Sequence, residues 1–60
     1  MKTDTIKSEY PAAYRIGCQL AANPQRTVTE RLEADALRQE AARNGWTALV
    51  TQVAVEMAGR

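Results

Sequence analysis

A single cysteine, Cys18, and the complete lack of histidine limit how this chain of 60 residues can be stabilised. One cysteine excludes an intrachain disulfide, and one thiol without histidine does not make a zinc site. A chain of this length buries only about 60 % of the surface that its unfolded form exposes. Domains this small commonly gain stability from disulfides, metals or oligomers. Because the first two routes are closed within one chain, the sequence favours a homodimer or a partner protein.

The first half of the chain contains one segment with helical periodicity. We expect residues 1–9, which are polar and charged, to form a flexible N-terminal segment. Residues 10–60 are then expected to form a single helical domain. Its first helix is predicted over 11–22, with a proline in the first turn, where its missing N–H has no partner to lose. The Asn-Pro pair that follows ends this helix, since the residue before proline avoids the helical conformation.

A second helix is predicted over 28–43. It begins with Thr27 and Glu30, which have the spacing of a capping box. A helix with two narrow apolar stripes on different sides is expected to contact two neighbours. It is therefore either the central helix of a three-helix arrangement or a helix that also pairs with a second copy. The two stripes consist of Val28, Leu32 and Ala36, and of Ala34, Leu37 and Ala41.

The last segment, 47–58, follows an Asn-Gly pair that is typical of a helix end. Its valines and threonines favour a strand, but its apolar residues recur with helical spacing and a lone strand would be unstable. We therefore predict a third helix, with Thr47 as its cap. The fold class is all-α, a small three-helix domain in which the helices 28–43 and 47–58 form an antiparallel helical hairpin.

The composition argues against several function classes. Without histidine, an activated nucleophile or a glycine-rich phosphate loop, the sequence predicts no catalytic, metal or cofactor site, so the protein is not expected to be an enzyme. Cys18 is interpreted as a small buried hydrophobic residue. A net charge of +1 argues against a nucleic-acid partner. The longest uncharged stretch is too short to cross a bilayer, so we expect no membrane partner and a cytoplasmic location.

One short motif supports an alternative function. The spacing of Ala41 and Gly45, followed by an apolar residue and a hydroxyl, resembles the turn of helix-turn-helix proteins. The resemblance covers about one third of the chain and implies a small dimeric DNA-binding regulator with 47–58 as its recognition helix. However, Glu40 stands where the motif has an apolar residue, and 47–58 contains no lysine or arginine to contact bases or phosphates.

A second short pattern is shared with another family. Tyr14, Gly17 and the later pair Gly45-Trp46 are spaced in a way that resembles the ribosome modulation factor family. The chain lacks the Cys-Pro-Tyr segment and the strong positive charge of that family, so ribosome binding is not inferred.

The sequence therefore favours a non-catalytic protein–protein interaction module that binds a larger host protein or complex. Abundant alanine and an excess of arginine over lysine are common in GC-rich bacteria and their mobile elements. This association makes a phage- or mobile-element-encoded inhibitor the leading hypothesis, with steric blocking as its mechanism and an anti-CRISPR protein as the specific form. Aromatic residues and arginines dominate the binding energy of many interfaces. The candidate contact residues are Tyr10, Tyr14, Arg31, Arg38 and Trp46.

Overall fold

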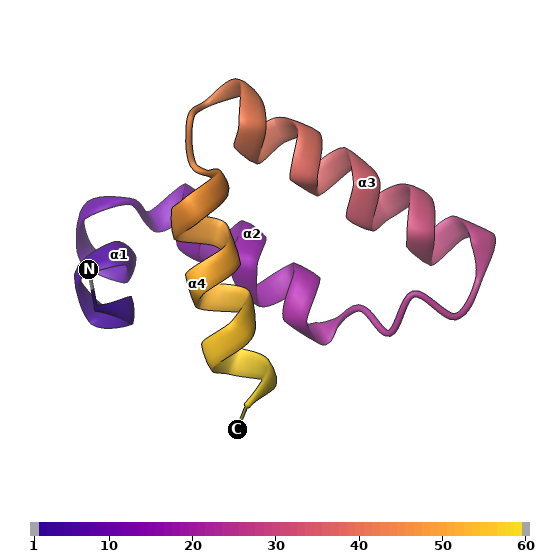
Figure 1. Cartoon of the computed structure of the whole chain (residues 1–60), viewed down its shortest axis with the longest axis horizontal. Coiled ribbons are helices and arrows are strands. Elements are labelled where there is room, and N and C mark those ends of the chain that lie inside the picture. The colour runs from indigo at the N-terminus through magenta and orange to yellow at the C-terminus, as the bar shows by residue number, and fades with distance from the viewer. Residues whose placement is uncertain (1, 60) are drawn as a thin grey trace.

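The computed structural model describes residues 2–59, which form four helices and contain no strand (Figure 1). The helices are α1 (Thr3–Glu9), α2 (Pro11–Ala22), α3 (Val28–Arg43) and α4 (Thr47–Ala58). The predicted all-α class is confirmed. The bounds of α2, α3 and α4 coincide with the three helices that the sequence predicts.

The N-terminal region differs from the sequence-based expectation of a flexible segment. Residues 3–9 form α1, and the side chain of Ile6 is 0 % exposed. The hydroxyl of Thr3 donates a hydrogen bond to the carboxylate of Glu56 in α4. Because Ile6 enters the common core, its contacts fix a segment that is too short and polar to form a helix alone. Met1, the first residue of the predicted segment 1–9, and Arg60, the last residue of the predicted domain 10–60, lie outside the described residues.

The core lies mainly between α2 and α4, which make the most extensive contact of any two helices (Figure 1). Gly17 of α2 lies against Val53 of α4, so the two helices approach closely at this point. The fully buried apolar side chains that meet here come from α1, α2, α3 and α4. They are Ile6, Ala13, Ile16, Ala41, Val50 and Val53.

The antiparallel hairpin expected for α3 and α4 is not confirmed, because α4 packs chiefly on α2 and contacts α3 much less. In Figure 1, α3 runs along one side of the molecule and comes near α4 at its C-terminal end. The residues that α3 buries completely, Ala34 and Ala41, are small. They offer α4 less apolar surface than the isoleucine-containing face of α2 does, so burial of apolar area favours the α2–α4 pair.

The turns before and after α3 have the predicted chemistry. The backbone N–H of Glu30 donates to the hydroxyl of Thr27 at 3.1 Å, and the N–H of Thr27 donates to the Glu30 carboxylate at 3.0 Å. Gly45 has a φ of 72°, the left-handed conformation that ends many helices. One detail differs: Trp46, without a side-chain cap bond, occupies the N-cap of α4, and Thr47 is its first helical residue.

We expect Thr27→Ala to lower the free energy of unfolding by about 1 kcal/mol, because it leaves the Glu30 N–H without its acceptor. Thr29→Ala is the matched control: Thr29 is also exposed, lies within the first turn of α3 and is not the cap residue. Urea unfolding followed by circular dichroism measures both. A Thr27→Ala protein as stable as wild type would show that the capping box contributes nothing.

Candidate partner-binding site

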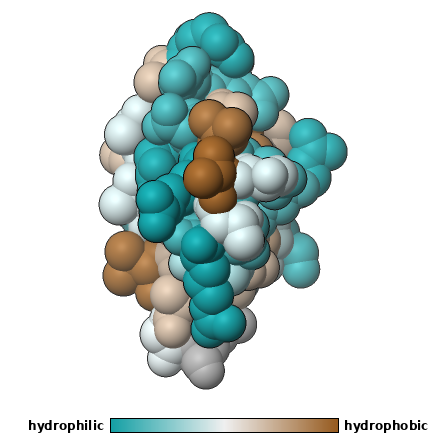
Figure 2. Space-filling model, turned by 90° about the vertical axis from the view of Figure 1, so that its right-hand side faces the viewer, coloured by the Kyte–Doolittle hydropathy of each residue, from teal (hydrophilic) through white to brown (hydrophobic). Residues whose placement is uncertain are grey.

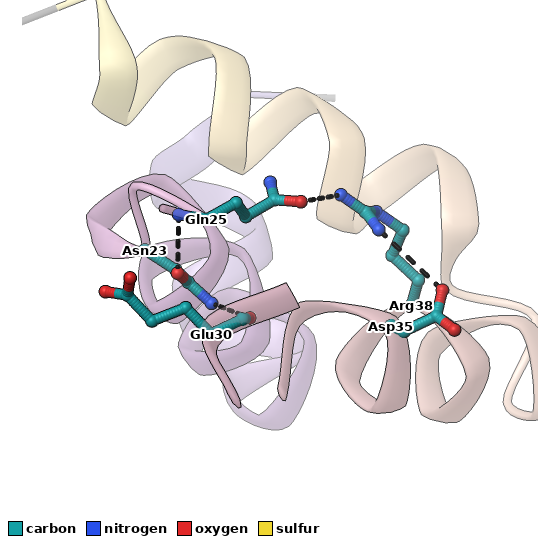
Figure 3. A network of polar contacts seen from close by, with 5 residues as sticks. All are labelled: Asn23, Gln25, Glu30, Asp35 and Arg38. Carbon is teal, nitrogen blue, oxygen red and sulfur yellow. Dashed lines mark hydrogen bonds and ion pairs between the residues drawn. The ribbon is translucent and has the colours of Figure 1, made fainter. Parts of the chain in front are cut away.

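The loop between α2 and α3 is fixed by the side chain of Asn23. Its Oδ1 accepts the backbone N–H of Gln25 at 2.9 Å, and its Nδ2 donates to the backbone carbonyl of Glu30 at 2.7 Å (Figure 3). These bonds hold Gln25 at a φ of 53°, a region that residues other than glycine rarely adopt. Such strain persists only where the surroundings enforce it, so the position of Gln25 is well defined.

Gln25 brings together the two arginines that the sequence singles out. Its Oε1 accepts a hydrogen bond from Nη2 of Arg38 at 3.1 Å, and its backbone carbonyl accepts one from Nε of Arg31 at 3.4 Å. Nη1 of Arg38 also lies 3.9 Å from Oδ1 of Asp35, one helical turn away (Figure 3). The sequence analysis did not identify Gln25. The Asn-Pro pair indicates that a turn begins here, but nothing in the sequence indicates that the glutamine after it adopts the left-handed backbone conformation.

Beside this bridge lies an open groove of about 290 Å³ between the end of α2, the C-terminal half of α3 and one face of α4. Its polar residues are Gln25, Arg38, Thr47 and Thr51. Its apolar residues are Leu20, Ala41, Val50, Ala54 and Val55.

Val55 is the most unusual residue of the groove, because its side chain is 67 % exposed. It is also the one apolar residue of α4 that departs from the helical apolar arc in the sequence. The face shown in Figure 2 carries separate hydrophobic patches within a mostly hydrophilic surface. An exposed valine at the edge of an apolar groove, with an arginine at the same rim, can bind an aliphatic side chain and a neighbouring carboxylate.

The three predicted aromatic contact residues lie elsewhere. Tyr10 is 39 % exposed at the junction of α1 and α2. Tyr14 is half-buried against the core, and Nζ of Lys7 lies 5.5 Å from the centroid of its ring. Trp46 is also half-buried against the core, at the corner between α3 and α4. None of these aromatic residues lines the groove. Of the five predicted contact residues, the structure therefore brings together only Arg31 and Arg38, through their hydrogen bonds to Gln25.

Three further properties of residues 2–59 can be stated. No group of three or more His, Cys, Asp or Glu side chains within this range is placed to hold a metal ion. Cys18 is half-buried and packs against the core. In the same range, no helix is both long and apolar enough to cross a membrane.

No protein-family model matches the chain, and neither a curated protein nor a solved structure is significantly similar to it. The resemblances to helix-turn-helix proteins and to the ribosome modulation factor family therefore rest on short motifs alone.

Proposed function

We propose that this protein is a non-catalytic interaction module that binds a larger host protein through the groove between α2, α3 and α4. The observation that carries the proposal is the combination of an exposed valine, Val55, with a positioned arginine, Arg38, on one groove. The groove volume of about 290 Å³ lies at the lower limit of small-molecule pockets, which span about 300–1,000 Å³. It suits one or two side chains of a partner better than a whole ligand.

The charges around the groove define the chemistry of the partner. Gln25 holds Arg38 at the rim and Arg31 about two turns away on the same side of α3. Arginines that are already positioned lose less conformational freedom when they bind a carboxylate. We therefore propose that the partner presents an aliphatic side chain to the groove and an acidic residue to Arg38.

The mode of action that we propose is inhibition by occlusion, because a domain this small acts most simply by covering a surface of a larger protein. The alanine- and arginine-rich composition supports a source in a mobile element, for which an anti-CRISPR protein is the specific form. Expression in a host with active CRISPR immunity tests this form by the plating efficiency of a targeted phage. If the plating efficiency of the phage does not change, anti-CRISPR activity is excluded. This result would not contradict the proposed binding of a partner through the groove.

We expect Val55→Gln to reduce recovery of the host partner about tenfold or more, because it removes an aliphatic side chain that the partner buries. The measurement is an affinity pull-down from nuclease-treated host lysate, quantified by mass spectrometry. Leu32→Gln is the matched control, since Leu32 of α3 is almost as exposed, at 65 % against 67 %, and does not line the groove. Arg38→Gln is expected to weaken binding and to flatten its salt dependence.

Two outcomes would contradict the proposal. Equal recovery of the partner by wild type and Val55→Gln would show that the groove is not the docking site. If no protein is recovered, and DNA is bound with a steep salt dependence when nuclease is left out, the helix-turn-helix alternative takes its place.

A further inference from the structure

The outward face of α3 carries an apolar stripe that no helix within residues 2–59 covers. The inward side of α3 contains Ala34 and Ala41, both buried, and the half-buried Leu37. The second apolar stripe of this helix points away from the core, and Val28 and Leu32 are 70 % and 65 % exposed. The outer stripe, as we call it, consists of Val28, Leu32 and Ala36.

The outer stripe forms one continuous apolar row, because its members follow one another at intervals of four residues. Figure 2 views the side of the molecule on which the N-terminal half of α3 lies, and it shows a hydrophobic patch bordered by hydrophilic surface. A helix of 16 residues that buries only two alanines completely gains little from its own domain. The outer stripe is therefore the side on which α3 can gain further apolar burial.

Charges of opposite sign border the two sides of the outer stripe. Arg31 and Arg38 lie along one side, and Glu33 and Glu40 lie along the other, each about 100° from the stripe around the helix. Asp35 is paired with Arg38 at 3.9 Å, which leaves the first border with a net positive charge. The stripe therefore has one basic and one acidic border.

This arrangement is complementary to itself when two copies of α3 pack in parallel. Rotation about an axis parallel to the helices places the basic border of one copy against the acidic border of the other. Arg31 then faces Glu33 of the second copy, and Arg38 faces Glu40, each pair offset by about 3 Å along the helix. In an antiparallel pair the two basic borders would meet, and so would the two acidic borders, which costs energy.

We propose that the outer stripe is a self-association surface, on which a second copy of this chain packs with its α3 parallel to the first. The charge pattern identifies a second copy as the occupant, since this chain itself supplies both complementary borders. The small core and the lack of an intrachain disulfide give the chain a reason to associate. The two proposals share one residue, because Arg38 borders the outer stripe and also lines the groove, whereas Val28, Leu32 and Ala36 do not line the groove.

A concentration series in analytical ultracentrifugation tests the self-association. Wild type is expected to pass from monomer to dimer as its concentration rises. Leu32→Gln is expected to raise the dissociation constant about a hundredfold or more, because each dimer loses two buried leucines. Val55→Gln is the matched control and is expected to leave the dissociation constant unchanged. Circular dichroism of the three proteins verifies that each remains helical.

Two results of this series would overturn the proposal. One is a wild-type protein that stays monomeric at every concentration. The other is a dimer that Leu32→Gln does not weaken, since a different surface would then hold the two copies together. The comparison also separates the two proposals, because Val55 lines the groove and is not part of the outer stripe, whereas Leu32 belongs to the outer stripe and does not line the groove.

Cross-linking tests the parallel orientation. In a Cys18→Ser background, Ala36→Cys places one thiol on the outer stripe of each copy. A short bismaleimide should link the two copies, because equivalent residues lie side by side in a parallel pair. In an antiparallel pair centred on Leu32, the two thiols would be about 12 Å apart along the axis. A mixture of Val28→Cys and Ala36→Cys proteins would then cross-link instead, and this result would refute the parallel arrangement.

Discussion

Replacing Gly17 with alanine is expected to lower the free energy of unfolding by about 2 kcal/mol or more, within the range measured for overpacked cores. A Cβ at this position would lie 2.6 Å from both Cβ and Cγ1 of Val53, and 3.1 Å from the carbonyl oxygen of Val50. The Cβ of Val53 cannot rotate away, so α2 and α4 would have to separate. Alanine favours a helix interior over glycine by about 1 kcal/mol, which offsets only part of this cost.

Gly59→Ala is the matched control, since a Cβ there would make only ordinary contacts of 3.4 Å and longer. Its effect should stay within about 0.5 kcal/mol, as for most surface substitutions. Urea unfolding followed by the fluorescence of Trp46 and by circular dichroism measures both variants. A Gly17→Ala protein as stable as wild type would contradict the close approach of α2 to Val53 of α4. The loss is large for this chain, because single cores of this size rarely supply more than about 3–5 kcal/mol.

We expect Ile6→Ala to be the second strongly destabilising change, with a loss of about 2–5 kcal/mol. Ile6 is fully buried and is the largest side chain that α1 contributes to the core. Its removal leaves a cavity where α1 contacts α2 and α4. Because α1 has only seven residues, it is not expected to stay helical without this contact.

Ile6→Val is the graded control and should cost about 0.5–1.5 kcal/mol, since it removes one methylene group and keeps the branched shape. Hydrogen exchange of the amides in α1, together with urea unfolding, measures both variants. If Ile6→Ala leaves stability and exchange unchanged, residues 3–9 behave as the flexible segment that the sequence predicts, and their helix contributes nothing to the fold.

Part of the candidate site was predictable from the sequence. Arg31 and Arg38 lie seven residues apart in a predicted helix, which places them on one side of it. The sequence also predicts Tyr10, Tyr14 and Trp46 as contacts, because aromatic residues often anchor interfaces, but none of them lines the groove. The groove residues Leu20 and Val55 could not be identified, because their proximity depends on how α2 and α4 are packed.

The sequence by itself determined where the three longer helices begin and end. Four of these boundaries depend on local chemistry: proline in the first turn of α2, the Asn23-Pro24 pair at its end, the capping box of Thr27 and the left-handed Gly45. These effects act within a few residues of the chain. They are therefore present in the sequence before any tertiary contact forms.

The tertiary structure alone decided which helix α4 packs on, whether residues 3–9 are helical, and the conformation of Gln25. Each depends on contacts between residues far apart in the chain, such as Ile6 with the core or Gln25 with Arg38. Such contacts are chosen by the apolar area they bury and by the fit of the side chains, as the close approach of Gly17 to Val53 shows. Helical periodicity fixes which residues share a face, but it does not fix which face of another helix they meet.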